Sequence, residues 1–227
     1  MIQPVIAIHG GAGAMSRAAM SPEKEQEYLS ALESILAAGQ AVLARGGSAL
    51  DAVTEAVRLL EDCPLFNAGH GAVFTSAGTH ELDAAIMDGA TLRSGAIANV
   101  NCVRNPVFAA RAVMETSKHV FFVGEGAEAF AKDAGLELVD PSYFSTEARR
   151  EQLLRVQRET PEAAVLDHDG QAMVARGQPA PADPLDSDKK FGTVGAVALD
   201  AQGNLAAATS TGGITNKQAV SYTHLRA

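Results

Sequence analysis

The sequence has few cysteines, no cluster of positive charge and no long apolar run. Its two cysteines, Cys63 and Cys102, lack the CxxC spacing of redox or zinc motifs. They therefore indicate packed thiols in a reducing compartment rather than a disulfide scaffold. The net charge is −9 and no Lys/Arg cluster interrupts it. Nucleic-acid phosphates and anionic membrane surfaces are poor partners for such a chain, and a small molecule or a peptide is the expected one.

Several targeting and ligand motifs are missing as well. No apolar stretch has the length of a membrane span, and the first residues lack the basic and apolar regions of a signal peptide. These absences predict a cytoplasmic protein. The glycines Gly10, Gly11 and Gly13 do not have the GxGxxG spacing of a dinucleotide site, and His80-Glu81 is not followed by the second histidine of HExxH. We expect no organic cofactor.

What the chain does contain predicts one α+β domain. Its 227 residues are 47% hydrophobic, enough for a buried core. Helices are expected to begin at Ser21-Pro22 and at Ser48, whose Ser-Ala-Leu-Asp sequence resembles a capping box, and to pair antiparallel over a sheet. A further helix is expected to begin at Asn105-Pro106, and two more are expected to cover 127–132 and 147–158. The expected strands are 5–8, 72–75, 83–88, 94–103, 120–123, 193–199 and 205–209.

Two acidic residues and a long polar segment are expected to have structural roles rather than chemical ones. Asp83 and Asp88 lie near the two ends of one predicted strand. We expect both to be solvated or to cap turns, as acids at strand ends usually do. Residues 161–190 are polar and contain several prolines, so they predict an exposed linker.

Gly192-Thr193 follows that linker and opens an apolar run with β-strand character. Many ordinary strands begin this way. The same arrangement also suits a hydrolase that cleaves itself before Thr193, because the cleavage would place a free α-amine beside the threonine hydroxyl. The amine could then act as the general base for that hydroxyl.

A hairpin after Thr193 predicts a neighbour for it. The runs 193–199 and 205–209 are joined by a glycine-containing turn, so the second strand returns Thr211 to the neighbourhood of Thr193. A hydroxyl there could donate to the oxygen of Thr193, although a turn rich in hydroxyls and without chemistry has the same pattern. The early Gly10-Gly11 turn is interpreted as a place where another backbone comes close, although a plain turn has the same local pattern.

Six segments together resemble the family of isoaspartyl peptidases, or plant-type L-asparaginases, which are N-terminal nucleophile hydrolases. The segments are His9-Gly10-Gly11-Ala12-Gly13, Leu65-Phe66-Asn67-Ala68-Gly69, Glu81-Leu82-Asp83-Ala84, Met87-Asp88-Gly89, 192–198 and 209–213. The resemblance implies a four-layer αββα sandwich. It also implies an autoprocessing threonine hydrolase that cleaves β-aspartyl peptides and L-asparagine to aspartate through an acyl-enzyme.

The resemblance assigns residues by position. Gly192-Thr193 is similar to the self-cleavage bond, Thr193 to the nucleophile and Thr211 to the threonine that helps to activate it. Asn67, Gly213, Gly10 and Gly11 resemble residues that line or support the substrate site. The loop from Leu60 to His70 resembles one that wraps a structural sodium ion with backbone oxygens, which the resemblance places on Leu60, Glu61, Cys63, Phe66, Ala68 and His70.

The resemblance also predicts how the chain is divided. Residues 1–192 correspond to an α subunit and 193–217 to the start of a β subunit, and the family's active form is a dimer of two-subunit protomers. Residues 218–227 do not match the family, and the expected substrate-clamping and oxyanion residues do not follow. We therefore expect a truncated chain with an incomplete second sheet. The alternatives are a catalytically inactive fragment and the related glycosylasparaginase.

Overall fold

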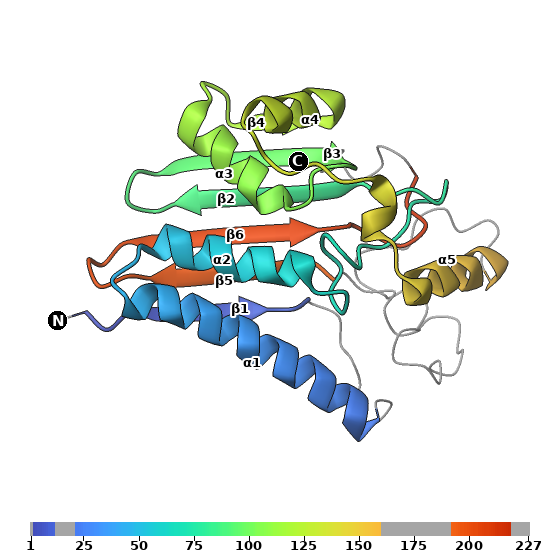
Figure 1. The fold of residues 1–227 in the computed structure, drawn as a ribbon, viewed down its shortest axis with the longest axis horizontal. Coiled ribbons are helices and arrows are strands. Elements are labelled where there is room, and N and C mark those ends of the chain that lie inside the picture. Colours follow the sequence, from blue (N-terminus) through green and yellow to red (C-terminus); the bar gives the residue numbers. More distant parts are fainter. Residues whose placement is uncertain (1, 12–20, 160–191, 219–227) are drawn as a thin grey trace, which may run out of the picture.

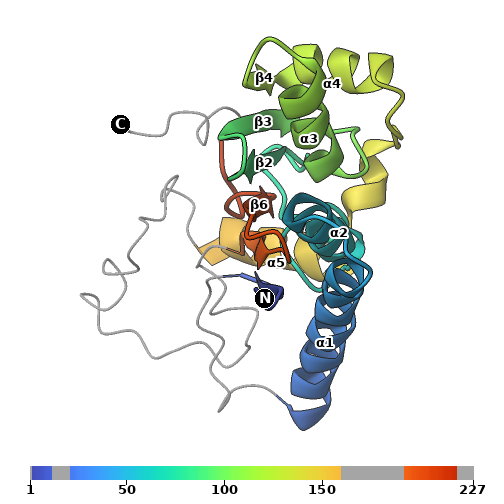
Figure 2. The ribbon, with the colours of Figure 1, turned by 90° about the vertical axis from the view of Figure 1, so that its left-hand side faces the viewer.

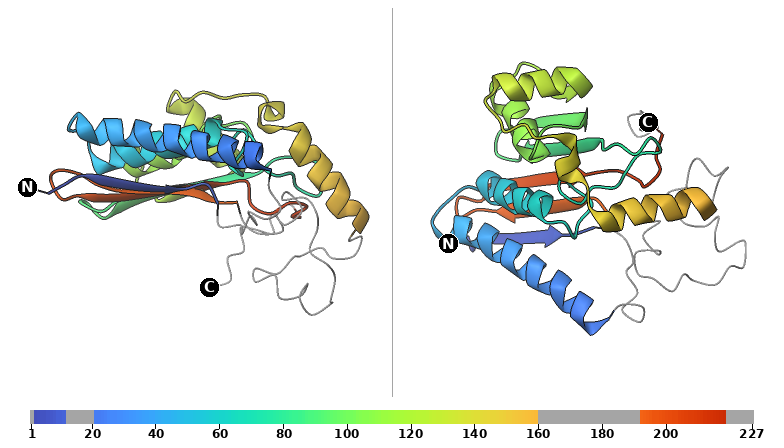
Figure 3. Two further views of the ribbon diagram at one scale, coloured as in Figure 1. Left: turned by 90° about the horizontal axis from the view of Figure 1, so that it is seen from below. Right: turned by 45° about the vertical axis from the view of Figure 1, so that its right-hand side comes forward.

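A computed structural model describes residues 2–11, 21–159 and 192–218. They form one six-stranded sheet with helices on one of its faces (Figures 1 and 2). Seen along the sheet, helices α1 to α4 lie on one side and the other side carries no described helix, while α5 extends from one end (Figure 3). The described part is therefore a mixed α+β fold with an open sheet face. The expected linker 161–190 and nearly all of the tail 218–227 lie outside the described residues.

The chain alternates between the sheet and its helical layer, and the strand order is β1-β5-β6-β2-β3-β4, antiparallel except for β3 and β4. The elements in chain order are β1 (Val5–His9), α1 (Pro22–Ala44), α2 (Ala49–Asp62), β2 (Leu82–Asp88), β3 (Arg93–Val100), α3 (Pro106–Thr116), β4 (Phe121–Val123), α4 (Gly124–Asp133), the 3₁₀ helix η2 (Pro141–Phe144), α5 (Glu147–Glu159), β5 (Val194–Leu199) and β6 (Leu205–Thr211).

The first two helices begin where the sequence predicts. The Ser21 side chain accepts a hydrogen bond from the Lys24 amide, and Pro22 occupies the first helical turn. The Ser48 hydroxyl oxygen accepts one from the Asp51 amide at 3.1 Å. Each cap satisfies an amide that the helix itself leaves without a partner. The two helices pack as an antiparallel pair on the sheet, as expected (Figure 1).

Small and branched apolar side chains fill the space between the helices and the sheet. Val53, Val57 and Leu60 of α2 are fully buried, and Leu82 and Ile86 of β2 belong to the same buried cluster. Side chains alternate along β2, with buried residues at every second position. This alternation confirms the predicted strand and places its other residues on the open face.

The predicted strand 72–75 is wrong, because its backbone groups bond elsewhere. The Val73 amide donates to Asn67 Oδ1, and the Val73 carbonyl oxygen lies 3.2 Å from Nδ1 of His80. The Phe74 oxygen accepts from the Asn216 amide. Only Thr75 forms a ladder contact, an isolated bridge to Lys217. Side chains and turns have taken the bonds that a strand would need.

The hairpin of β5 and β6 lies inside the sheet, between β1 and β2. Its register pairs Val194 with Ser210 and Leu199 with Leu205, so the predicted hairpin is confirmed, with β5 beginning one residue after Thr193. Two further strands cover the hairpin edges. The start of β5 and the end of β6 are therefore held at one end of a continuous sheet.

Candidate active site

Three polar residues line up at that end of the sheet. In the described ladder, Val194 pairs with Ser210 and Asp83 with Thr211. Continuing the first pairing by one residue puts Thr193 opposite Thr211. Residues directly opposite in a sheet point to the same face, with Cβ atoms about 5 Å apart. Thr193, which directly precedes β5, therefore lies in line with Thr211 of β6 and Asp83 of β2 on the open face.

The two threonines differ in how they are held. Thr193 is half-buried, whereas Thr211 is only 8% exposed. The Thr211 oxygen Oγ1 accepts a hydrogen bond from the Gly213 amide at 3.0 Å. A hydroxyl that accepts in this way keeps its own proton for donation. Thr211 can therefore donate toward the neighbouring strand, where Thr193 lies.

Glycines let three backbone segments meet in front of Thr193. An ideal Cβ on Gly11 would lie 3.1 Å from Gly192 Cα, and Gly11 has a φ of +141°. A Cβ on Gly192 would lie 2.5 Å from Asn67 Cβ. At Gly10 the added atom would clash with the Phe66 ring. The predicted close approach at the early glycine turn is confirmed, and the approaching backbone is the residue before Thr193.

Asn67 joins the loop after α2 to the turn after β6. Its side-chain nitrogen donates to the Gly213 oxygen at 2.7 Å, and its Oδ1 accepts from the Val73 amide at 2.9 Å. Its backbone oxygen accepts from the Gly212 amide at 3.0 Å. Only 4% of Asn67 is exposed. These bonds hold Gly212 and Gly213, and through Gly213 they act on Thr211.

A group of charged residues lies beside Thr211, and its lysine is one that the sequence did not single out. Lys217 is 5% exposed, its ammonium donates to the Glu81 backbone oxygen at 3.0 Å, and it forms an ion pair with the Glu81 carboxylate at 3.5 Å. Burial raises the pKa of Asp83 and lowers the pKa of Lys217, although the charges of Asp83 and Glu81 oppose the second shift.

The expectation for the two acids of β2 holds for one of them only. Asp88 caps the turn after the strand, because it accepts from the Ala90 amide and the Thr91 hydroxyl. Asp83 fits the expectation only in part: it is partly exposed but caps no turn, and it accepts from the Asn99 amide at 2.8 Å across a bulged part of the β2–β3 pair. Its environment depends on Lys217, which no local pattern around residue 83 reveals.

Beneath β6, on the helical side of the sheet, a second carboxyl group is fully buried. Glu61 Oε1 accepts from the Val107 amide at 2.9 Å. Burial raises the pKa of Glu61 to about 8, and the hydrogen bond from the Val107 amide offsets only part of the shift. The group is thus largely protonated at neutral pH. It lies on the face opposite to Thr193 and supports the strand from behind.

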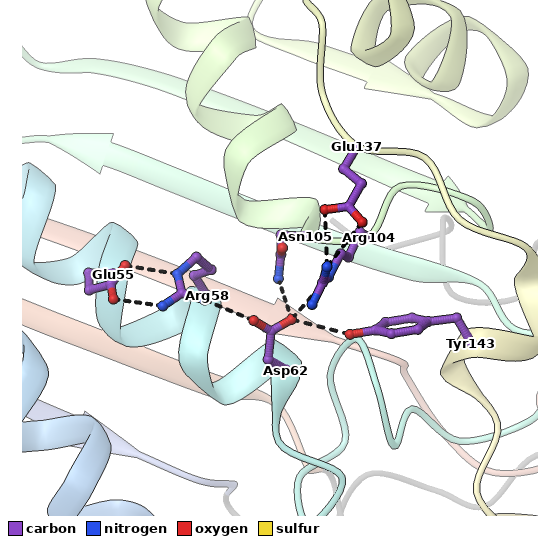
Figure 4. Close-up of polar contacts among 7 residues, drawn as sticks. All are labelled: Glu55, Arg58, Asp62, Arg104, Asn105, Glu137 and Tyr143. Carbon is purple, nitrogen blue, oxygen red and sulfur yellow. Dashed lines mark hydrogen bonds and ion pairs between the residues drawn. The ribbon is translucent and has the colours of Figure 1, made fainter.

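The loop Leu60–His70 begins at a network centred on Asp62 (Figure 4). Asp62 accepts from Arg58, Asn105 and Tyr143, at 2.8, 3.1 and 3.3 Å, and Arg104 links it to Glu137. Within the loop, the His70 amide donates to the Glu61 backbone oxygen at 2.7 Å. The network fixes the end of α2, where the loop that carries Asn67 begins.

Comparison with known families shows where the chain belongs. The profile of the family described as "Asparaginase" matches residues 2–220. The chain belongs to this family. The resemblance drawn from the six sequence segments is therefore confirmed. Among the described residues, no helix is long and apolar enough to cross a membrane.

Individual members of the asparaginase family are similar over nearly the whole chain. An isoaspartyl peptidase of Escherichia coli (strain K12) is 60% identical over 96% of the chain, which covers 63% of that protein. The isoaspartyl peptidase of Salmonella typhimurium is 61% identical, with 65% of its length covered. An isoaspartyl peptidase/L-asparaginase of Xenopus laevis is 40% identical, with 62% covered. The chain thus spans less than two thirds of these relatives.

Proposed function

We propose that this chain carries the nucleophile of a threonine hydrolase that releases aspartate from β-aspartyl (isoaspartyl) peptides and from L-asparagine. The observation that supports it most is the alignment of Thr193 with Thr211 at a sheet end, where Gly192 is pressed between Gly11 and Asn67. The names of the family and of its relatives support the substrate class.

The chemistry starts with hydrolysis of the Gly192–Thr193 bond, which adds one water and leaves a carboxylate on Gly192 and an α-amine on Thr193. That amine takes the proton of the Thr193 hydroxyl, and the oxygen attacks the side-chain carbonyl carbon of the substrate. The proton passes to the leaving ammonia or amino group, and an acyl-enzyme remains. Water then adds to the ester carbon and releases aspartate. Thr211 donates to the Thr193 oxygen and keeps it in position.

We also propose that the open face of the sheet packs against a second sheet, which completes the four-layer sandwich. Large apolar side chains of four adjacent strands support this: Val5, Met87, Val197 and Leu205 are 43% to 60% exposed on the face away from the helices. Soluble domains rarely leave such a surface uncovered. A second sheet there would also shield Thr193 and Thr211 from water. Three expectations stay predictions: that the protein assembles into a dimer of two-subunit protomers, that it is located in the cytoplasm, and the alternative that the chain is an inactive fragment.

The sodium loop stays a proposal with a partial structural basis. Its six donors, the backbone oxygens of residues 60, 61, 63, 66, 68 and 70, are hard ligands of the kind that suit alkali cations. Two of them, on Glu61 and Cys63, already accept amide hydrogen bonds. A carbonyl oxygen has a second lone pair, so these bonds leave room for a cation. Bound sodium would stiffen the loop that carries Asn67.

Mass spectrometry of the purified chain tests the main proposal. We expect cleavage between Gly192 and Thr193, and release of aspartate from a β-aspartyl dipeptide and ammonia from L-asparagine. Thr193→Ala should abolish all three. Thr209→Val is the matched control, because Thr209 is an exposed threonine on the same face of β6. An intact wild-type chain that releases neither product would show that the proposal is wrong for this chain.

A further inference from the structure

Lys217 is a buried cation outside the machinery described so far. It follows the turn after β6, and its backbone is tied down: the Ser76 amide donates to its oxygen at 2.8 Å, and its own amide donates to the Ile214 oxygen at 3.2 Å. A lysine is rarely buried to this extent unless it is paired. The side chain therefore has a position that the fold specifies.

The partners of the Lys217 ammonium come from β2 and the residue before it. Besides the Glu81 backbone oxygen at 3.0 Å and the Glu81 carboxylate at 3.5 Å, the Asp83 carboxylate attracts it. Asp83 is the residue that pairs with Thr211. The cation thus joins the turn after β6 to the strand that lies beside β6.

The same ammonium lies against Gly213. An ideal Cβ on Gly213 would be 2.9 Å from Lys217 Nζ and 3.2 Å from its Cδ. Gly213 has a φ of +78°, and its amide donates to Thr211 Oγ1. Lys217 therefore contacts the glycine that holds the Thr211 oxygen, while its charge lies near the acid that pairs with Thr211.

We propose that Lys217 is a positioning residue for Thr211. Its ammonium, bonded to Glu81 and attracted by Asp83, fixes the Gly212–Gly213 turn so that the Gly213 amide donates to Oγ1 of Thr211 and the hydroxyl proton is directed to Thr193. The last clause rests on the proposed function, in which Thr193 is the nucleophile. Lys217 itself does not touch the substrate, because its side chain is 3% exposed.

Two readouts on Lys217→Met test the inference in the full chain. The first is residue-resolved amide hydrogen exchange. Protection of the Gly213 amide should fall at least about tenfold, the size expected when the charged hydrogen bond from Lys217 to the Glu81 oxygen is lost, while the β5 amides stay protected. The second is hydrolysis of a β-aspartyl dipeptide, where kcat should fall about 10²-fold at nearly unchanged KM, since the threonine is misplaced and the substrate contacts remain.

Three further variants separate positioning from general destabilisation. Lys217→Arg keeps the positive charge and should recover most of both losses. Glu81→Gln removes one partner charge but keeps the backbone acceptor, so both readouts should move less and in the same direction. Lys24→Met, at an exposed lysine paired with Glu27, should change neither.

The outcomes distinguish the two proposals. A Lys217→Met chain with a fully protected Gly213 amide overturns the positioning role, and so does one with wild-type kcat. If the wild-type chain neither cleaves itself nor hydrolyses the dipeptide, the proposed function fails. Exchange at Gly213 then still decides whether Lys217 fixes the turn.

Discussion

Replacing Asn67 by alanine tests how much its hydrogen bonds between the loop after α2 and the turn after β6 stabilise the fold. The change removes the donor to the Gly213 oxygen and the acceptor of the Val73 amide, and it leaves both buried backbone groups without their partner. Each such group costs about 1–3 kcal/mol. We expect the free energy of unfolding to fall by about 2–6 kcal/mol for the two groups together, and the backbone bond from the Gly212 amide should survive.

Urea unfolding at constant pH measures this change, with the slope of the transition as a check that the unfolded state is comparable. Asn204→Ala is the control. It removes one side-chain bond, to Asp200, in the hairpin turn and should cost about 1 kcal/mol. If Asn67→Ala lowered the free energy of unfolding by no more than the control, Asn67 would not hold the turn, and the argument that links it to Thr211 would fail.

Four other substitutions have expected outcomes of their own. Gly95→Ala should cost about 3 kcal/mol in urea unfolding, since a methyl there meets the α3 backbone at Ala110 and Met114, whereas Gly126→Ala, with open space around it, should be neutral or slightly stabilising. Ser48→Ala removes the cap of α2 and should cost about 1 kcal/mol, seen as a lower Tm. Burial lowers the pKa of His80 from 6.5 to about 4, so the unfolded chain binds more protons between these values. The free energy of unfolding should then decline as pH falls from 6.5 towards 4, and His80→Asn should flatten this part of the curve; equal slopes in both proteins would contradict it.

Sequence patterns correctly predicted the elements that depend on residues close together in the chain. The caps at Ser21 and Ser48, the alternation along β2 and the hairpin after Thr193 each depend on residues a few positions apart, and each is present. The wrong strand at 72–75 depends on partners that no such pattern contains. Asn67 and His80 take the bonds of Val73 because the loop folds back on itself.

The site divides in the same way. Thr193 and Thr211 were placed together by the hairpin, and Gly11 by its need for close backbone approach, so a sequence argument reached them. The Lys217 charge lies near Asp83 only because β2 inserts next to β6, a sheet order that sequence patterns did not predict. A lysine after a glycine-rich turn normally points to solvent. The sequence around Gly213 therefore contained no indication that Lys217 is buried.

The turn between β5 and β6 sets the register that brings Thr193 opposite Thr211. Asp200 is 1% exposed, and its carboxylate accepts from the amides of Gln202, Asn204 and Ala49, which fixes the turn and ties it to the start of α2. A register slip of one residue would turn Ser210 to the open face and Thr211 towards the helices. The alignment of Thr193 with Thr211 thus depends on a turn at the opposite end of the sheet, which makes Asp200 a condition for the chemistry although it lies far from the reacting atoms.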